Sequence, residues 1–134
     1  KGLITIAAAP DFTNNFCEEN LNKNQIHELN NKGYVNIKSN YDEKGYIITK
    51  NLIESGNKNL ILNNSLNSLD CPIKLLHGEK DKDVDWIHSK KIFNKIKSIN
   101  AELIIIKNGD HRLSSKNNLN TIVYSIKSLI SIIT

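Results

Sequence analysis

The residues that could do acid–base chemistry in this chain lie in two short stretches. The first is an apolar segment that ends at Gly78 and is followed by the carboxylates Asp81 and Asp83. The second is an apolar segment that runs into G-D-H-R, which contains His111. A neutral imidazole can take a proton from a hydroxyl or thiol nucleophile, and a carboxylate bonded to its other nitrogen fixes the tautomer and stabilises the imidazolium. An acid and a histidine that each follow a strand therefore predict two members of a nucleophile–acid–base triad.

The surrounding pattern indicates how these two loops could meet. Short apolar runs over residues 73–76 and 103–106 are typical of buried strands, and apolar side chains at helical spacing predict a helix over 86–99 between them. One helix is enough to join two parallel strands, and the loops after both strands then lie at the same edge of the sheet. We therefore predict that Asp81 is the acid that orients His111.

Two alternatives to this pairing are open on the sequence. Asp83 is the rival acid, because the register of the loop after Gly78 cannot be fixed from the order of residues. The second alternative is that the loop carboxylates and His111 never meet. In that case the chain would be a receiver-like or other doubly wound binding module without this chemistry.

The rest of the chain predicts an α/β fold with a mostly parallel sheet, flanking helices and a small insertion. Residues 1–9 are an apolar run typical of a strand buried on both faces, and residues 119–133 carry an apolar stripe typical of a closing helix. The polar interval of about 12–61 predicts a lid over the site. Its expected elements are one or two helices within 16–32 ending at Gly33, a hairpin of 34–39 and 46–48 with its turn at 40–45, and a helix capped by Thr49 and ended by Gly56.

The composition of the chain indicates which partners and which cellular location are expected. The 134 residues carry a net charge of +4 and a pI near 9.0, but acidic residues are spread throughout and no basic block alternates with aromatics, so no nucleic-acid partner is expected. No apolar run approaches the ~20 residues that cross a bilayer. Cys17 and Cys71 are far apart and predict buried free thiols, as in a reducing cytoplasm, which is the expected location.

Other groups that could carry chemistry are assigned simpler roles. No spacing of histidines and carboxylates is typical of a zinc site, so no metal or cofactor is expected. His77 stands at the end of its strand and is predicted to be packed and hydrogen-bonded. The acid–base chemistry of the chain therefore rests on Asp81 and His111.

The two stretches match known motifs. H-G-E-K-D-K-D-V-D-W resembles the acid loop of α/β-hydrolases, usually H-G-x-x-D-x-x-V-P, and N-G-D-H-R-L-S resembles their histidine loop. With segments such as A-A-A-P-D-F-T and D-C-P-I-K-L-L-H-G, the chain is similar to the branch that contains the acyl-glucuronide esterase and palmitoyl-protein thioesterase of mitochondria and its bacterial relatives. The resemblance implies that Asp81 is the catalytic acid and His111 the base. The motif has proline where this chain has Asp85, a change expected to loosen the loop.

The resemblance also implies a serine nucleophile that these residues do not contain. The family places it in G-x-S-x-G, before the strand with which this chain begins, and Ser55 has Ile53 and Asn57 where glycines are required. Because the order in the family is serine, acid, histidine, the serine and the oxyanion-hole donors are expected upstream of Lys1. An apolar start and the lack of any methionine are expected of the C-terminal portion of a longer hydrolase domain.

The function expected on these grounds is that of a serine hydrolase that cleaves small carboxylic esters or thioesters through an acyl-enzyme. This chain would supply the acid and the histidine, would need the missing N-terminal portion as its partner, and would be inactive alone. An alternative is a non-catalytic binding protein with the same fold, which an upstream sequence without the serine motif would reveal.

Overall fold

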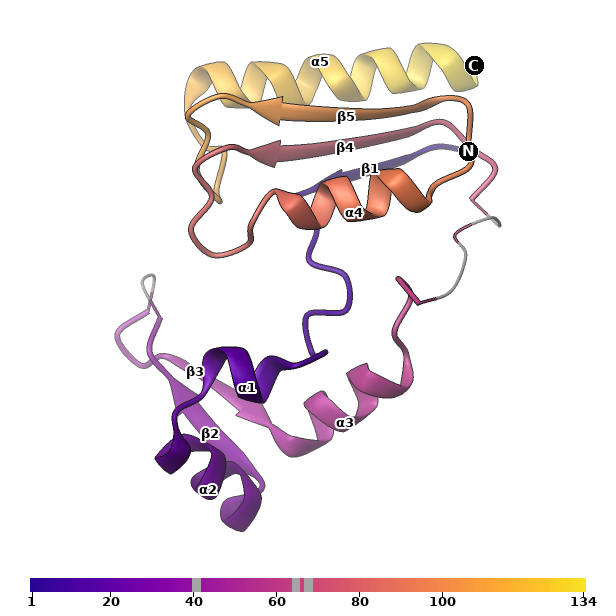
Figure 1. Cartoon of the computed structure of the whole chain (residues 1–134). Coiled ribbons are helices and arrows are strands. Elements are labelled where there is room, and N and C mark those ends of the chain that lie inside the picture. Colours follow the sequence, from indigo (N-terminus) through magenta and orange to yellow (C-terminus); the bar gives the residue numbers. More distant parts are fainter. Residues whose placement is uncertain (40–41, 64–65, 67–68) are drawn as a thin grey trace. The chain divides into compact units, whose positions relative to one another are not determined.

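The computed structural model describes residues 1–39, 42–63, 66 and 69–134. They form two compact units (Figure 1). The first unit consists of Lys1–Pro10 together with Ile61–Thr134, and the second is the intervening segment Asp11–Leu60. The chain therefore leaves the first unit after one strand and returns to it before the strand that precedes Asp81.

The first unit contains a three-stranded sheet in the order β1-β4-β5, in which neighbouring strands are parallel. Its strands are β1 (Leu3–Ile6), β4 (Ile73–Gly78) and β5 (Ala101–Ile106). The predicted parallel sheet is confirmed. The central strand β4 runs beyond its predicted end, because His77 and Gly78 still pair with Ile105 and Ile106 of β5. This strand delivers the chain directly into the loop that carries Asp81.

Two helices flank the sheet of the first unit, α4 (Ile87–Lys95) and α5 (Lys116–Ile133) (Figure 1). Ile92 of α4 packs with Ile73 and Leu75 of β4 in a buried core. The last helix starts before the predicted residue 119, because Ser115 caps it: the Ser115 hydroxyl oxygen accepts a hydrogen bond from the amide of Asn118.

The helix predicted over 86–99 is shorter than expected. It ends at Lys95, and Ile96 has an extended conformation with φ of −75° and ψ of 133°. The chain must turn there to enter β5, and the Ser98 hydroxyl donates a 2.9 Å hydrogen bond to the carbonyl of Cys71. Ile99, placed on the helix by its spacing, is 97% exposed.

Burial was overestimated at both ends of the chain. The strand β1 is half-buried rather than buried on both faces, because it lies at the edge of the described sheet. Of the apolar stripe predicted on α5, Leu129 is buried while Ile126 and Ile130 are exposed. An apolar spacing shows which helix face can be buried, but the packing partners decide how much of it is.

The second unit has the elements predicted for the insertion. They are α1 (Phe16–Asn20), α2 (Lys23–Lys32), β2 (Tyr34–Ile37), β3 (Tyr46–Thr49) and α3 (Lys50–Lys58). The strands β2 and β3 pair antiparallel as the predicted hairpin, and positions 40 and 41 of its turn lie outside the described residues. Leu29, Val35 and Ile48 belong to a core within this unit. Its role as a lid stays a prediction.

Two glycines of the second unit have different structural roles. Gly33 has a φ of 79° and ends α2 as predicted, and the Thr49 side chain caps α3 as predicted. Gly56 does not end α3, which continues to Lys58, so that prediction is wrong. A Cβ at Gly56 would lie 2.4 Å from the side chain of Thr13, so this glycine allows Thr13 to pack closely against the helix.

No helix in the described part of the chain is long and apolar enough to cross a membrane. Cys17 and Cys71 are free thiols, as predicted, although both are half-buried rather than buried. They lie in different units.

The core around β4 predicts a large loss of stability on truncation. Leu75→Ala removes a side chain with 0% exposure, and we expect the free energy of unfolding to fall by about 2–5 kcal/mol. Ile99→Ala is the control, because truncating an exposed side chain should change the free energy of unfolding by less than about 0.5 kcal/mol. Urea unfolding of both variants in the intact protein measures the difference, and equal midpoints would contradict the described core.

Candidate active site

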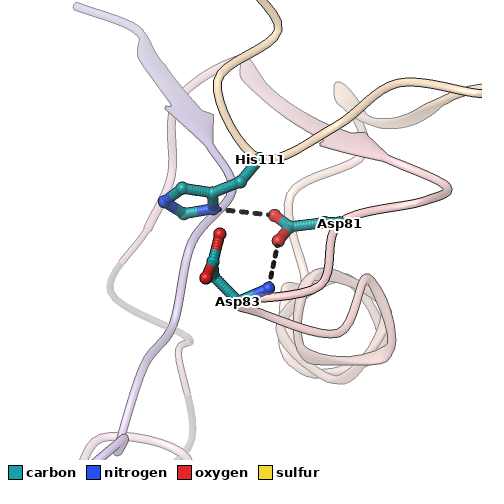
Figure 2. A group of neighbouring side chains, drawn as sticks. All are labelled: Asp81, Asp83 and His111. Carbon is teal, nitrogen blue, oxygen red and sulfur yellow. Dashed lines mark hydrogen bonds and ion pairs between the residues drawn. The ribbon is translucent and has the colours of Figure 1, made fainter. Parts of the chain in front are cut away.

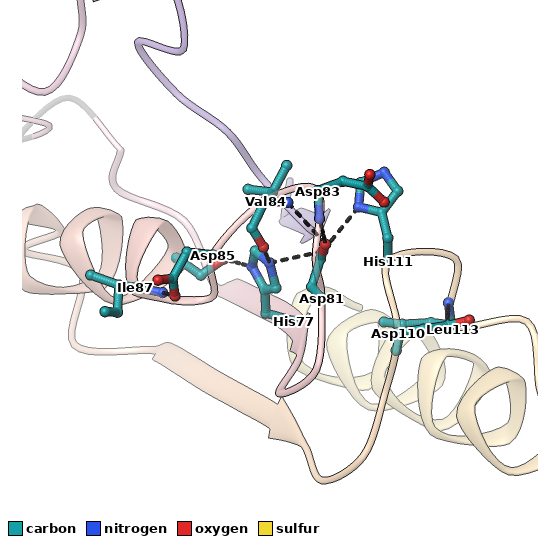
Figure 3. A network of polar contacts seen from close by, with 10 residues as sticks. His77, Asp81, Asp83, Val84, Asp85, Ile87, Asp110, His111 and Leu113 are labelled. Carbon is teal, nitrogen blue, oxygen red and sulfur yellow. Dashed lines mark hydrogen bonds and ion pairs between the residues drawn. The ribbon is translucent and has the colours of Figure 1, made fainter. Parts of the chain in front are cut away.

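Asp81 lies on the loop between β4 and α4, and the backbone of its own loop holds its carboxylate. Oδ1 accepts hydrogen bonds of 2.9 Å from the amides of Asp83 and Val84. The Asp81 side chain is 0% exposed. An aspartate that bonds the amides two and three residues ahead closes a tight turn. The carboxylate is therefore fixed in position by a local loop structure (Figure 3).

The acid loop ends at α4, where Asp85 stands in place of the motif's proline. Oδ1 of Asp85 accepts a 2.9 Å hydrogen bond from the amide of Ile87, and the Asp85 carbonyl accepts one of 2.9 Å from the amide of His88. These bonds satisfy amides of the first helical turn. Asp85 is therefore hydrogen-bonded to the first turn of α4. The looser loop expected from the missing proline stays a prediction.

His111 lies on the loop between β5 and α5, which is bent by residues with positive φ. Asn108 has a φ of 58° and Leu113 a φ of 47°. For leucine this conformation is strained. It is maintained because the Leu113 side chain is fully buried and its amide donates a 2.8 Å hydrogen bond to Oδ1 of Asp110. The buried leucine therefore fixes the loop shortly after His111.

Backbone hydrogen bonds join the acid loop and the histidine loop directly. The Glu79 amide donates to the Ile106 carbonyl at 2.9 Å, and the Lys80 amide donates to the Gly109 carbonyl at 2.8 Å. The Glu79 carboxylate also accepts a 3.0 Å hydrogen bond from the amide of Asn108. The pairing of β4 with β5 is thus continued past the ends of both strands, and the two loops begin side by side.

Glycines allow the loops to approach this closely. A Cβ at Gly78 would lie 2.5 Å from the carbonyl oxygens of Gly109 and Asp110. A Cβ at Gly109 would lie 3.1 Å from the Cα of Gly78. Any side chain at Gly78 would therefore push the histidine loop away from the acid loop.

This arrangement brings the two predicted site residues together (Figure 2). Nδ1 of His111 lies 2.9 Å from Oδ2 of Asp81. An ionised carboxylate can only accept, so Nδ1 carries the hydrogen and Nε2 is the nitrogen that can take a proton from a nucleophile. The His111 side chain is 35% exposed while that of Asp81 is 0% exposed. The pair thus has a buried acid and an accessible base, and the catalytic roles of both residues stay predictions.

Asp83, the rival acid, is an exposed residue near this pair. One ligand atom from each of Asp81, Asp83 and His111 lies within 4.8 Å of the others, so these three could hold a metal ion, which the sequence spacing did not predict. Asp81 already uses both oxygens, because Oδ1 accepts two backbone hydrogen bonds and Oδ2 accepts one from His111. A metal would displace these bonds, so the arrangement fits an acid–base pair better than a ligand set.

The hydrogen bonds to Asp81 determine its charge state. Burial by itself raises the pKa of the Asp81 carboxyl, because the charged form loses solvation. Hydrogen bonds from the Val84 amide, the His111 ring and the Asp83 amide favour the charged form, and together they lower the pKa of Asp81 below its ordinary value. Asp81 is therefore an anion at neutral pH, which is the state that can orient His111.

His77 is fully buried and hydrogen-bonded, as predicted. Its ring contacts the hydroxyl of Ser89 and the carbonyl of Val84. Its Nε2 also lies 3.2 Å from Oδ2 of Asp81, a contact that the sequence analysis missed. The motif H-G-x-x-D places the histidine and the aspartate four positions apart, and this spacing is the sequence feature that could have predicted the contact.

A cavity of about 640 Å³ lies between the end of β5 and the start of α5. Its walls include the polar residues Asn108, Asp110, Ser115 and Thr121 and the apolar Ile106. Neither Asp81 nor His111 lines it, so it is not where a substrate of this pair would react.

Comparisons with known proteins show which protein family this chain is similar to. No family model matches the chain. Palmitoyl-protein thioesterase ABHD10, mitochondrial, from Bos taurus is 34% identical over 104 residues, which are 77% of this chain and 34% of that protein. A protein from Agrobacterium vitis S4 described as a putative hydrolase has a crystal structure that matches this one with a TM-score of 0.90. It is 31% identical in sequence, and the match covers 97% of this chain and 49% of the other. Alpha/beta hydrolase domain-containing protein 10 from mouse is 30% identical with a TM-score of 0.82, covering 99% of this chain and 53% of the other.

A parallel sheet that ends in an acid loop and a histidine loop, and that superposes on these relatives, shows that the chain belongs to the α/β-hydrolase superfamily. The chain spans about half the length of the two solved relatives and about a third of the thioesterase from cattle. Within the superfamily it resembles the branch of palmitoyl-protein thioesterase ABHD10, so the resemblance read from the motifs is confirmed.

Gly78→Ala should separate the two loops. The added methyl group would meet carbonyl oxygens of the histidine loop, so we expect the free energy of unfolding to fall by about 1–3 kcal/mol and the bond between Asp81 and His111 to be lost. Gly2→Ala is the comparison variant, because the nearest atoms to a Cβ there are side-chain atoms of Leu129 at 3.1–3.3 Å rather than backbone carbonyl oxygens at 2.5 Å. Urea unfolding measures the stability and the Nδ1–H proton resonance of His111 reports the bond. A Gly78→Ala protein that keeps both would rule out the close contact between the loops.

The lowered pKa of Asp81 predicts that the site loses stability in acid. A carboxyl with a lower pKa in the folded than in the unfolded state stabilises the fold above its unfolded-state pKa, and this contribution is lost as the pH falls through the folded-state pKa. We expect the difference in free energy of unfolding between wild type and Asp81→Asn to be constant above about pH 5 and to shrink below about pH 4. Urea unfolding at a series of pH values measures it, with the exposed Asp70→Asn as control. A difference that does not change with pH would argue against a lowered pKa.

Proposed function

We propose that this chain supplies the acid and the base of a serine hydrolase that cleaves small carboxylic esters or thioesters. The observation that carries the proposal is the 2.9 Å contact between Nδ1 of His111 and the Asp81 carboxylate, on loops that follow neighbouring parallel strands. The relative from cattle is named a palmitoyl-protein thioesterase, which supports acyl transfer as the reaction class. No metal, cofactor or nucleic acid takes part in the proposed reaction.

The proposed reaction runs in two halves through an acyl-enzyme. The serine oxygen attacks the acyl carbonyl while Nε2 of His111 takes the serine proton, and His111 then gives this proton to the leaving alcohol or thiol. In the second half a water molecule attacks the acyl-enzyme, His111 takes the proton of the water, and the proton returns to the serine oxygen. Asp81 stays ionised throughout and stabilises the imidazolium through Nδ1.

The serine is proposed to lie upstream of Lys1 in a longer protein. The sequence has no G-x-S-x-G motif, and the nucleophile of this fold precedes the acid and the histidine in the chain. β1 lies at the edge of the described sheet and has backbone groups that an upstream strand could pair with. The upstream portion of the same fold is therefore the proposed partner, and the 134 residues alone are proposed to be inactive.

The second unit, Asp11–Leu60, is proposed to form part of a lid over the acyl group. It is inserted after β1, which runs parallel to β4, so the insertion begins at the edge of the sheet where the acid loop begins. A lid at this edge would exclude water from the acyl-enzyme. The cytoplasm stays the proposed location on the basis of the two free thiols, whereas the relative from cattle is named as mitochondrial.

Hydrolysis of p-nitrophenyl esters and acyl thioesters by the full-length protein tests the proposal. His111→Ala and Asp81→Asn should each lower kcat/KM on the order of 10⁴-fold, because either change removes a member of the triad. Asp70→Asn is the matched control, because it changes an exposed aspartate before β4, at the opposite end of that strand from Asp81. A fluorophosphonate should label one serine upstream of Lys1.

The alternatives give different results in the same experiments. Loss of activity in Asp83→Asn with retained activity in Asp81→Asn would assign the acid to Asp83. A full-length protein without a reactive serine would be a non-catalytic binding protein of the same fold. Ester turnover by the isolated 134 residues would contradict an upstream nucleophile.

A further inference from the structure

We propose that His77 is a positioning residue that sets the orientation of the Asp81 carboxylate. The inference rests on the proposed function and adds a residue to the same site. His77 is the penultimate residue of β4 and is 0% exposed. Its ring lies on the side of Asp81 away from His111, so it acts through the acid (Figure 3).

Three contacts fix the His77 ring. Nδ1 lies 2.7 Å from Oγ of Ser89, and Nε2 lies 2.9 Å from the carbonyl oxygen of Val84. Nε2 also lies 3.2 Å from Oδ2 of Asp81. Ser89 belongs to α4 and is fully buried. The ring thus connects the end of β4, the start of α4 and the acid loop.

These partners determine which ring nitrogen of His77 carries the hydrogen. The Val84 carbonyl can only accept, so Nε2 must carry a hydrogen whether the ring is neutral or charged. In the neutral ring Nδ1 is then an acceptor, and the Ser89 hydroxyl donates to it. The Nε2–H of His77 is therefore directed at the Val84 carbonyl, and the same nitrogen lies 3.2 Å from Oδ2 of Asp81, so the ring packs directly against the carboxylate.

His77 also acts on Asp81 through the backbone of Val84. Nε2 of His77 donates to the Val84 carbonyl, and the amide of the same residue donates to Oδ1 of Asp81 at 2.9 Å. One oxygen of the carboxylate is thus held through Val84, and the other is in direct contact with the ring. With both oxygens constrained, Oδ2 stays directed at Nδ1 of His111.

The position of the carboxylate matters because the acid of a triad works by holding the imidazole in one orientation and tautomer. A change in a residue that positions a catalytic group, without touching substrate, typically costs about 10–100-fold in activity. His77 meets this description, because it is buried, contacts the acid and has a ring orientation fixed by Ser89 from a separate element.

His77→Phe in the full-length protein removes the ring nitrogens and keeps a planar side chain. We expect kcat for ester hydrolysis to fall by about 10–100-fold while KM stays near its wild-type value. His77→Gln returns an N–H donor at similar reach and should recover most of the lost kcat. A His77→Phe protein with wild-type kcat and only a lower Tm would overturn the inference, because His77 would then serve packing alone.

A second variant avoids changing the ring itself. Ser89→Ala removes the hydroxyl that orients His77 and should lower kcat by a smaller factor than His77→Phe. Ser125→Ala is the matched control, because the hydroxyl of this second buried serine donates to the Thr121 carbonyl within α5. Equal losses of kcat in the two serine variants would count against a path from Ser89 to Asp81.

The Asp81→Asn background separates positioning from packing. If His77 acts through the Asp81 carboxylate, His77→Phe should lower kcat far less in Asp81→Asn protein than in wild type. If His77→Phe lowered kcat by the same factor in wild type and in Asp81→Asn protein, the inference would be overturned.

A measurement without turnover keeps the inference separate from the proposed function. Nitrogen-15 NMR should show the neutral His77 ring protonated at Nε2 and unprotonated at Nδ1. The opposite tautomer would overturn the inference whatever the activity. Full activity in His111→Ala would refute the proposed function, whereas loss in His111→Ala with wild-type kcat in His77→Phe would refute the positioning role alone.

Discussion

The geometry of the candidate site depends on one buried carboxylate that its hydrogen bonds keep charged. The Asp81 side chain is 0% exposed, and an isolated buried carboxylate would be neutral. Three hydrogen bonds prevent this, two from the amides of Asp83 and Val84 and one from His111. Because these donors come from both loops, the charge of Asp81 and the position of His111 depend on the same group of hydrogen bonds.

The strand pairing explains why these donors can come together. β4 and β5 pair through Gly78 and Ile106, and the hydrogen bonds continue into both loops through Glu79 and Lys80. The histidine loop then turns sharply through a strained Leu113 that is fully buried. Strain of this kind persists only where the surrounding contacts hold it, and it is common at functional sites. The loop geometry is therefore maintained by the packing of the unit.

Much of this fold could be predicted from local patterns, and the errors have a common cause. The alternation of strands and helices, the caps at Gly33 and Thr49, and the hairpin of the second unit follow from residue types a few positions apart. The end of α4, the half-buried state of β1 and the helical position of Gly56 were missed. Each of these depends on what packs against the segment, which local spacing does not contain.

The sequence by itself indicated the superfamily and the order in which a carboxylate loop and a histidine loop follow its strands. An apolar strand that leads into H-G-x-x-D, and another that leads into G-D-H-R, place an acid and a histidine after successive strands of one sheet. The tertiary structure alone decided that the Asp81 carboxylate contacts Nδ1 of His111, and that His77 contacts the same carboxylate. The physical reason is distance: hydrogen bonds between loops form or fail over a few tenths of an ångström, and these distances are set by strand pairing and close glycine contacts rather than by neighbours in the chain.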